Sequence, residues 1–507
     1  MSSRGTAVTT LRGGPGIRVK NPPISSKAPL DFGSAATGFL FVALAIGVPF
    51  GIATSPSIFR DGDVSWQVAA GEWILKHGRI PTADPFSFTA AGQPWVATEW
   101  LAEIVYASTF RLAGYAGLAT IVAAAVIALN AMLFFYLQRR TSPMLLAATL
   151  VMMDFVLAPF ALARPHVLAW LPLAGWTIAL LRAQESGNPP SLWTALILVV
   201  WTNLHASYPL AIPIACAIGL DSLTKNGWAN LREWMMFGLV SIVALALNAN
   251  GVPGLLQPFK ISSLALLPYI GEWHPSSPRS TPYFFAVLLA GLGALLNSGI
   301  RIPVGRLLLL LVMLALAFVH VRHQSSFIIV AACILPTLWP SRPADAQVPS
   351  WLLLAALPLL TFRAVVPLTP PESEANPRSL LSAIPSDLRT QPVFNGYPFG
   401  GPLILAGIRP YIDGRADLYG DAFVADYFGI LGGDLPAFER AVQRYGIRWV
   451  MLPAGEKRLS QAIESSGEWR RVYADKIGLI DVKVPGPSRP RSNDAPDPSP
   501  PPASAAK

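Results

Sequence analysis

Long apolar segments recur along most of the chain, from Phe39 to Val366. The longer ones hold about 17 to 25 residues, the length at which an α-helix crosses a hydrocarbon core of roughly 30 Å. The pattern therefore predicts a multi-spanning α-helical membrane protein. We expect its spans at 36–54, 116–137, 144–161, 166–181, 192–220, 235–248, 283–296, 307–320, 327–339 and 351–366.

The segment 192–220 is interrupted by Asn203, His205 and Pro209. If it crosses twice as two short helices, or dips in as a re-entrant pair, the basic loops share the amino-terminal side, as the positive-inside rule prefers. This reading gives about eleven spans and places the loop 55–113 and the carboxy-terminal region on the far side. A single tilted crossing would instead move everything after it to the opposite face.

Two stretches of the loop 55–113 have the pattern of amphipathic helices. Trp66, Ala70 and Ile74 share one side of the first, which Gly78 ends, and the second begins near Thr98. Apolar residues on one side of a helix are typical of a helix that lies in the membrane interface. We therefore expect a structured outer loop.

Beyond Val366 the composition becomes that of a soluble domain. Helical patterns at 422–431 and 435–445 and strand patterns at 448–452 and 477–482 predict a small extracytoplasmic α/β domain over 367–484. The Pro-rich segment 485–507 lacks the apolar content to fold. Residues 1–35 are predicted to form a cytosolic tail before an uncleaved first span.

The composition supports a membrane protein and excludes several other classes. Of the 507 residues, 52% are hydrophobic and 13% charged, whereas an ordinary soluble domain has about 25% charged residues. The net charge of +9 is spread over short loops, so we expect no nucleic-acid partner. Cys216 and Cys333 lie in apolar segments and suggest no disulfide framework. The motifs of P-loop ATPases, zinc proteases and serine hydrolases are absent from the sequence.

Asp61 and Asp63 are the first candidates for chemistry, because they follow a predicted span and precede an amphipathic helix. Two carboxylates beside a low-dielectric wall have readily shifted pKa values and can serve as a general base, a second acceptor or a metal ligand. The alternative is a turn at Gly62 in which Asp63 caps the following helix. Both interpretations remain open.

Glu99 and Trp100 end the same loop and are candidate substrate-binding residues. Glu99 could equally be a first-turn charge that favours the helix dipole. Asp84, beside Pro85, is better explained as a turn residue.

Ionisable side chains at membrane depth or at its edge are rare and usually face a cavity or a partner. Asp154 is one of them. At the far-side ends of spans, cations could hold a lipid phosphate by charge-assisted hydrogen bonds, or could be snorkelling anchors. The candidates of this kind, together with the imidazole in the interrupted segment, are Arg164, His166, His205, Arg322 and His323.

Two further charged groups lie on the predicted far side. Glu272, next to Trp273, could contact a polar ligand, or could be a solvated residue beside an interfacial Trp. Asp413, Arg415 and Asp417 are expected to form an internal salt-bridged turn rather than a site.

Several motifs together resemble those of bacterial membrane glycosyltransferases of the GT-C superfamily. They are DGDVSWQVAAGEWILKHGRIPTADPFSFTAAGQPWVATEWLAEI, ARPHVLAW, WTNLHASYPL, GEWHP and the segment from VFNGYPFGG to IDGRADLYG. The resemblance implies a GT-C-like membrane enzyme of the bacterial cytoplasmic membrane that takes a sugar from a polyprenyl-phosphate donor and transfers it to an extracytoplasmic glycan, lipid or protein.

The resemblance also implies roles for individual residues. Asp61 or Asp63 would act as base for the acceptor hydroxyl or help to bind the donor, and Arg164 and Arg322 would hold the carrier phosphate. Relatives commonly have Trp-His where this chain has Trp66 and Gln67, so any role of that histidine is lost here. A divalent metal is left open, since metal dependence differs across the superfamily.

Two non-enzymatic functions compete with this one. The first is transport of a lipid-linked glycan, although the sequence shows neither a repeated half nor a line of charges through consecutive spans. The second is a non-catalytic role in polysaccharide assembly or export, with Gln67 marking lost chemistry.

Overall fold

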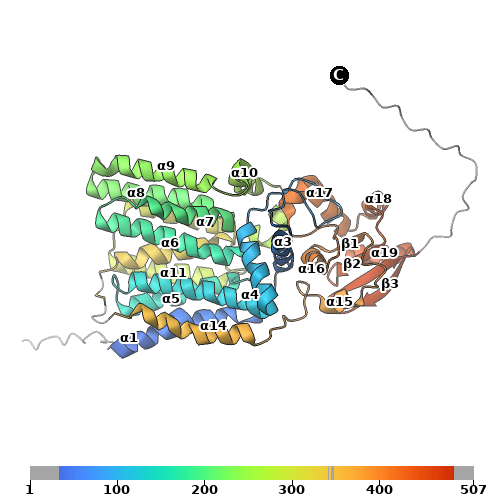
Figure 1. Cartoon of the computed structure of the whole chain (residues 1–507), viewed down its shortest axis with the longest axis horizontal. Helices are drawn as coiled ribbons and strands as arrows, with labels where there is room; N and C mark the ends of the chain where they lie inside the picture. The colour runs from blue at the N-terminus through green and yellow to red at the C-terminus, as the bar shows by residue number, and fades with distance from the viewer. Residues whose placement is uncertain (1–33, 266, 341, 344–346, 485–507) are drawn as a thin grey trace, which may run out of the picture.

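A helical bundle and a small α/β domain lie end to end in an elongated molecule (Figure 1). The computed structural model describes residues 34–484, apart from 266, 341 and 344–346. Most of the predicted tail 1–35 and all of the tail 485–507 lie outside the described residues.

The bundle begins with one continuous helical segment of three parts, α1 (Ser34–Phe41), a π-helical stretch (Val42–Gly47) and α2 (Val48–Ala53), which packs on α4. Short loops or turns separate most of the helices that follow. Their bounds are α3 (Asp63–His77), α4 (Trp100–Leu137), α5 (Pro143–Leu157), α6 (Pro165–Ser186), α7 (Leu196–Leu204), α8 (Ala211–Asn226), α9 (Leu231–Ala246), α10 (Gly251–Ser262), α11 (Pro282–Ser298), α12 (Val304–Val319), α13 (His323–Ile334) and α14 (Ala356–Val365).

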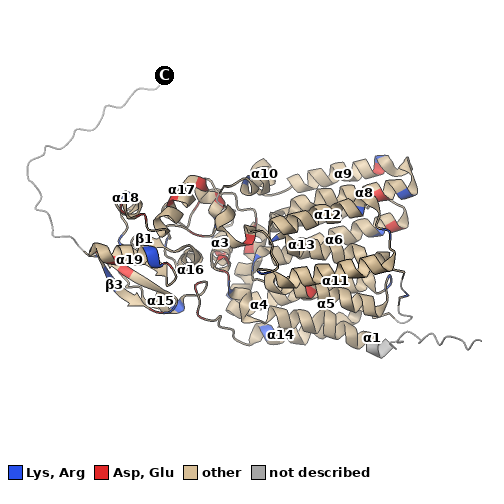
Figure 2. Cartoon of the chain, turned by 180° about the vertical axis from the view of Figure 1, so that it is seen from behind, with Lys and Arg blue, Asp and Glu red and all other residues tan. Residues whose placement is uncertain are grey.

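Four helices in the described part of the chain are long and apolar enough to cross a membrane, and six shorter apolar helices accompany them. Figure 2 shows that the bundle carries most of its charged residues near its ends. Asp154 is an exception, and it lies buried where Asn130 Nδ2 donates to its Oδ1 at 2.9 Å. The structure thus agrees with a multi-spanning membrane protein, while the count of about eleven spans stays a prediction.

Two helix interruptions shape the end of the bundle next to the α/β domain. The predicted amphipathic helix near Thr98 and the predicted span 116–137 form one element, α4, with a kink at Ala113 and Gly114, where Gly114 has φ +56°. The segment 192–220 forms two helices, because α7 ends at Leu204 and α8 begins at Ala211. The linker between α7 and α8 contains Pro209, which has no backbone N–H to continue a helix.

Next to the bundle, α10 was missed in the sequence. The pattern assigned no element to α10, because two Gly and two Pro residues fall within its twelve positions and such residues usually mark turns. In the structure α10 lies beside α9 and near the α/β domain (Figure 1).

The α/β domain is built on a four-stranded sheet with strand order β1-β2-β4-β3. Its strands are β1 (Val393–Asn395), β2 (Trp449–Pro453), β3 (Trp469–Ala474) and β4 (Gly478–Lys483). β1 and β2 are parallel, with Val393 opposite Trp449, and the other pairs are antiparallel. The strands predicted at 448–452 and 477–482 correspond to β2 and β4.

Helices cover both faces of this sheet, so β2 is buried along its whole length. Trp449 and Met451 face a core with α15 (Arg378–Ala383) and α16 (Gly400–Leu405), whereas Val450 and Leu452 face a core with α17, α18 and α19. The bounds of these last three helices are Ala416–Leu431 for α17, Leu435–Tyr445 for α18 and Lys457–Ser466 for α19.

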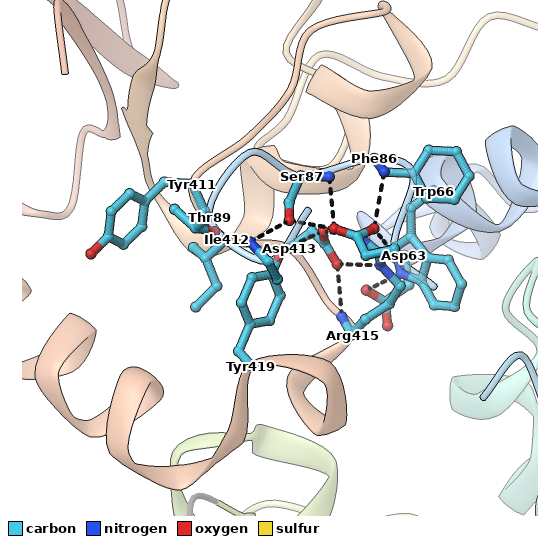
Figure 3. A network of polar contacts seen from close by, with 12 residues as sticks. Asp63, Trp66, Phe86, Ser87, Thr89, Tyr411, Ile412, Asp413, Arg415 and Tyr419 are labelled. Atoms are coloured by element: carbon cyan, nitrogen blue, oxygen red, sulfur yellow. Dashed lines mark hydrogen bonds and ion pairs between the residues drawn. The ribbon is translucent and has the colours of Figure 1, made fainter. Parts of the chain in front are cut away.

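A buried ionic network joins the outer loop to the α/β domain (Figure 3). Arg415 pairs with Asp413 at 2.6 Å, as the predicted salt-bridged turn requires, but it also pairs with Asp84 of the loop at 2.7 Å. Asp84 accepts hydrogen bonds from the backbone N–H groups of Phe86 and Ser87, which is the predicted turn. The expectation that Asp417 shares this turn is wrong, because Asp417 accepts a hydrogen bond from Gln257 of α10 instead.

We expect Arg415→Ala to lower the unfolding temperature of the protein strongly. The change leaves Asp84 and Asp413 unpaired in the interior, and loss of one partner of a buried ion pair costs about 3–5 kcal/mol. Thermal unfolding in detergent, followed by tryptophan fluorescence, measures the effect.

The control is Lys483→Ala, which removes a more exposed ion pair with Glu468, because such pairs are worth about 0–1 kcal/mol. Equal shifts of the unfolding temperature in the two variants would contradict the assigned role of Arg415.

Candidate active site

A large cavity of about 1350 Å³ lies where the bundle meets the outer loop and the α/β domain. Its walls include the start of α3, the first turn of α4, the start of α6, the linker between α7 and α8, and the first residues of α13 and α17. All ten candidate residues named from the sequence except Trp100 line it. They are Asp61, Asp63, Glu99, Arg164, His166, His205, Glu272, Arg322 and His323.

Arg164 is the centre of the charged part of this cavity. It precedes α6, and Tyr106 OH donates to its backbone carbonyl at 2.7 Å. Its Nη1 lies 2.7 Å from Asp61 Oδ2 and 3.2 Å from Glu272 Oε2, and its Nη2 lies 3.0 Å from Asp63 Oδ2. One guanidinium therefore contacts three carboxylates, two from the outer loop and one from the loop before α11.

Arg322 extends this network through Glu272. Its Nη1 donates to Glu272 Oε1 at 2.9 Å, and its guanidinium lies 4.5 Å from the centre of the Trp273 ring. Glu272 and Trp273 thus both contact Arg322 and are not a solvated pair. Because Arg322 shares a single carboxylate, it has more hydrogen-bonding capacity left for a ligand than Arg164 has.

Asp61 and Asp63 have different local roles from those expected. Asp61 Oδ1, not Asp63, accepts the backbone N–H at the start of α3, at 3.0 Å. Asp63 is the first residue of α3, and Trp66 Nε1 donates to its Oδ1 at 3.0 Å. The expectation that Asp63 caps the helix is wrong, because its side chain points to Trp66 and Arg164.

Glu99 belongs to a second polar cluster in the cavity. Its Oε1 lies 3.4 Å from His205 Nε2, and its Oε2 accepts from Gln67 Nε2 at 3.3 Å. Trp100 stands behind this cluster, where its Nε1 donates to Asn203 Oδ1 at 2.8 Å. Gln67 is therefore a buried partner of Glu99.

The other two histidines have contrasting surroundings. His166 Nε2 lies 2.6 Å from the carbonyl oxygen of Phe160, so this nitrogen carries a hydrogen. The rings of His166 and His205 are 6.3 Å apart. His323 begins α13, and its ring is 6.0 Å from that of His320. His166 thus lies near the Glu99 cluster, whereas His323 lies on the Arg322 side.

The α/β domain supplies the wall behind Asp63. A Cβ atom on Gly414 would collide with Asp63 Oδ1, and one on Gly401 would collide with the carbonyl oxygen of Gly62. Figure 3 shows Asp63 and Trp66 directly beside the Arg415 network. Sequence reasoning missed this contact, although the glycines near the charged turn IDGRAD were a visible signal of close backbone approach.

The electrostatic environment separates the carboxyls into two kinds. Burial, reinforced by the charge of Asp61, raises the pKa of Asp63 to about 7 despite the proximity of Arg164. Burial also raises the pKa of Glu99 to about 7. Burial opposes the ionisation of Glu272 too, but Arg322 and Arg164 hold its pKa at about 2. The carboxyl groups of Asp63 and Glu99 can therefore each gain or lose a proton near neutral pH, whereas Glu272 stays ionised.

The arrangement does not fit a bound metal ion. Within the described residues, no three His, Cys, Asp or Glu side chains form a group that could hold one. The carboxylates that would be the natural ligands, Asp61, Asp63 and Glu272, already surround the Arg164 guanidinium. A divalent ion would have to displace that side chain, so we assign no step to a metal.

Solved structures with the same fold include those of two proteins. The oligosaccharyltransferase AglB of Archaeoglobus fulgidus matches with a TM-score of 0.54 and 12% identity, over 83% of this chain and 69% of its own. ArnT of Cupriavidus metallidurans matches with a TM-score of 0.50 and 14% identity, over 90% of this chain and 100% of its own. Both are GT-C superfamily glycosyltransferases. The expected likeness to this superfamily is thus confirmed for the fold.

One of the AglB structures is a complex with an inhibitory peptide and a dolichol-phosphate, and it matches with a TM-score of 0.54 and 11% identity. No protein-family model matches the sequence, and a search of curated proteins finds no significant match.

We expect Arg164→Gln to lower the unfolding temperature most at neutral and alkaline pH. The positive charge of Arg164 stabilises the folded state wherever its carboxylate partners are ionised. Glu272, with a pKa of about 2 in the folded protein, contributes stability that is present above about pH 4.5, its ordinary range, and is lost as the pH falls towards 2. The deficit, which is the amount by which the unfolding temperature of the variant lies below that of the wild-type protein, should therefore shrink in acid.

Thermal unfolding at several pH values measures this effect, and Arg182→Gln, near the other end of α6, is the control. A deficit that is the same at all pH values would show that Arg164 acts through packing and not through its charge.

Proposed function

We propose that this protein is a glycosyltransferase of the bacterial cytoplasmic membrane that transfers a sugar from a polyprenyl-phosphate donor to an extracytoplasmic acceptor. The observation that carries the proposal is the cavity in a GT-C fold that unites carboxylates of the first loop with arginines at helix ends. The dolichol-phosphate complex of AglB supports a lipid-linked donor. The acceptor could be a glycan, a lipid or a protein.

The cavity residues provide what this transfer needs. The isoprenoid tail of such a donor stays in the bilayer, so its phosphate must be bound at the membrane boundary, next to apolar helices. Arg322 is the cation best able to hold it, because Arg164 is already shared among three carboxylates. The proposed substrate-binding surface is completed by His166, His205, His323, Glu99 and Glu272, with Trp100 behind it.

Asp61 and Asp63 are proposed to act on the reacting groups, either as base for the acceptor hydroxyl or by binding the hydroxyls of the donor sugar. As the acceptor oxygen forms its bond to the anomeric carbon, the bond to the phosphate oxygen breaks and the electron pair leaves with the carrier phosphate. That phosphate needs no proton because it is a good leaving group, and fixed positive charge stabilises it.

We expect the Asp61→Ala and Asp63→Ala double variant to lose transfer by about 100-fold or more, since a positioned proton-transfer group contributes about 10²–10⁴-fold. Membranes supplied with radiolabelled polyprenyl-phosphate hexoses and pentoses measure it. Glu72→Ala, an exposed acid of the same loop that pairs with Arg111, is the control. Unchanged turnover in the double variant would remove both residues from the mechanism. Movement of label across the bilayer without bond cleavage would favour a transporter instead.

We expect Arg322→Ala to weaken binding of polyprenyl phosphate by about 10–100-fold, which corresponds to the loss of hydrogen bonds to a charged group. Competition against labelled donor measures this affinity. Arg279→Ala is the control, because Arg279 is exposed in the loop that carries Glu272 and does not line the cavity. Equal affinities in the two variants would place the phosphate elsewhere.

A further inference from the structure

The carboxylates that surround Arg164 are poorly placed to accept a proton. Each oxygen of Asp61 and Asp63 already has a donor within 3.0 Å: the Asp63 N–H, Trp66 Nε1 or a nitrogen of Arg164. Both oxygens of Glu272 face arginines. An acceptor hydroxyl that donated to any of these oxygens would have to compete with a donor already in place.

Glu99 differs from the carboxylates around Arg164, because within the described part of the chain its polar contacts include no guanidinium. Its nearest polar partners are the neutral amide of Gln67 and the ring of His205, at 3.3 and 3.4 Å. These distances are long for hydrogen bonds, so the contacts leave Glu99 able to accept another donor. Glu99 also lines the cavity, where an acceptor hydroxyl can reach it.

The tautomer of His205 is set by its neighbours. The backbone N–H of Ser207 points at His205 Nδ1 from 3.1 Å, so this nitrogen is the acceptor. Ser207 Oγ lies 2.9 Å from the same nitrogen and itself accepts from Trp201 Nε1 at 3.0 Å. The hydrogen of the neutral ring is therefore on Nε2, which faces Glu99 Oε1 and stabilises its ionised form.

We propose that Glu99 is the general base of this enzyme and that His205 is its positioning residue. The inference rests on the proposed transfer reaction and assigns Asp61 and Asp63 to the donor. The Glu99 carboxylate takes the proton of the acceptor hydroxyl while the new bond to the anomeric carbon forms and the carrier phosphate leaves with its electron pair. The proton then passes from Glu99 to water in the cavity.

Several other charged groups act on Glu99 from the elements around it. Arg164 and Arg322 lower the pKa of Glu99, whereas Asp63 and Glu272 raise it. Because Glu99 and Asp63 both titrate near pH 7, a loss of rate in acid alone does not distinguish them. The variant that abolishes this pH dependence identifies the base. The groups facing Glu99 are Arg164, Arg322, Asp63, Glu272, Glu103 and His205.

The experiment measures kcat, KM and their pH dependence from about pH 5 to about pH 9, in native membranes given radiolabelled polyprenyl-phosphate hexoses and pentoses. We expect Glu99→Gln to lower kcat about 100-fold or more, to leave the KM for the donor little changed and to abolish the fall of kcat in acid. Asp63→Asn should keep that fall. Glu72→Gln is the matched control.

A second set of variants guards against misfolding and tests His205. Glu99→Asp, which keeps a carboxylate, should have a lower kcat but retain its fall in acid, the acid limb of the pH profile. His205→Ala should move that limb to higher pH, because the ionised carboxylate loses a donor, and His205→Gln, which restores an N–H, should move it back. A merely structural histidine would change kcat without moving the limb.

The outcomes separate this inference from the proposed function. If the wild-type protein transfers sugar and Glu99→Gln keeps its kcat and its acid limb, Glu99 is not the base and only the inference fails. If Asp63→Asn alone abolishes the limb, the base is Asp63. If wild-type membranes transfer no sugar from any of the donors, the proposed function and the inference fall together.

Discussion

The site depends on one cation held among three carboxylates. Without Arg164, the negative charges of Asp61, Asp63 and Glu272 would meet at a boundary of low dielectric, where unpaired charge is costly. With it, the outer loop, the start of α6 and the loop before α11 are joined at a single point. The same contact explains why the sequence can place so many acids near an apolar bundle.

The α/β domain is part of this arrangement rather than an appendage. Its glycines approach the backbone of α3 closely enough that Gly414 lies against Asp63, and Arg415 enters the outer loop to pair with Asp84. The Arg415–Asp84 pair is buried, and the guanidinium of Arg415 also lies 4.7 Å from the centre of the Trp95 ring. The position of Asp63 is therefore set from two sides, by the bundle through Arg164 and by the domain through Gly414.

The cavity contains two polar regions with different properties. Around Arg164 and Arg322 the carboxylates are paired with cations, which suits the binding of a charged and hydroxylated donor. Around Glu99 the partners are neutral, so burial governs its protonation. Separate surroundings let carboxyl groups a short way apart in the same cavity perform different tasks.

Much of this could be predicted from the sequence, because apolar length and loop charge depend on local composition. The helical bundle, the structured loop 55–113, the strands β2 and β4 and the candidates Asp61, Glu99, Arg164 and Arg322 all follow from such patterns. What only the tertiary structure decided is which of these groups meet: Arg164 with three carboxylates, Glu99 with His205, and Arg415 with Asp84 across 331 positions. Contacts between residues so far apart in the chain leave no periodic signal, and helices rich in Gly and Pro, such as α10, form only because packing overrides local preference.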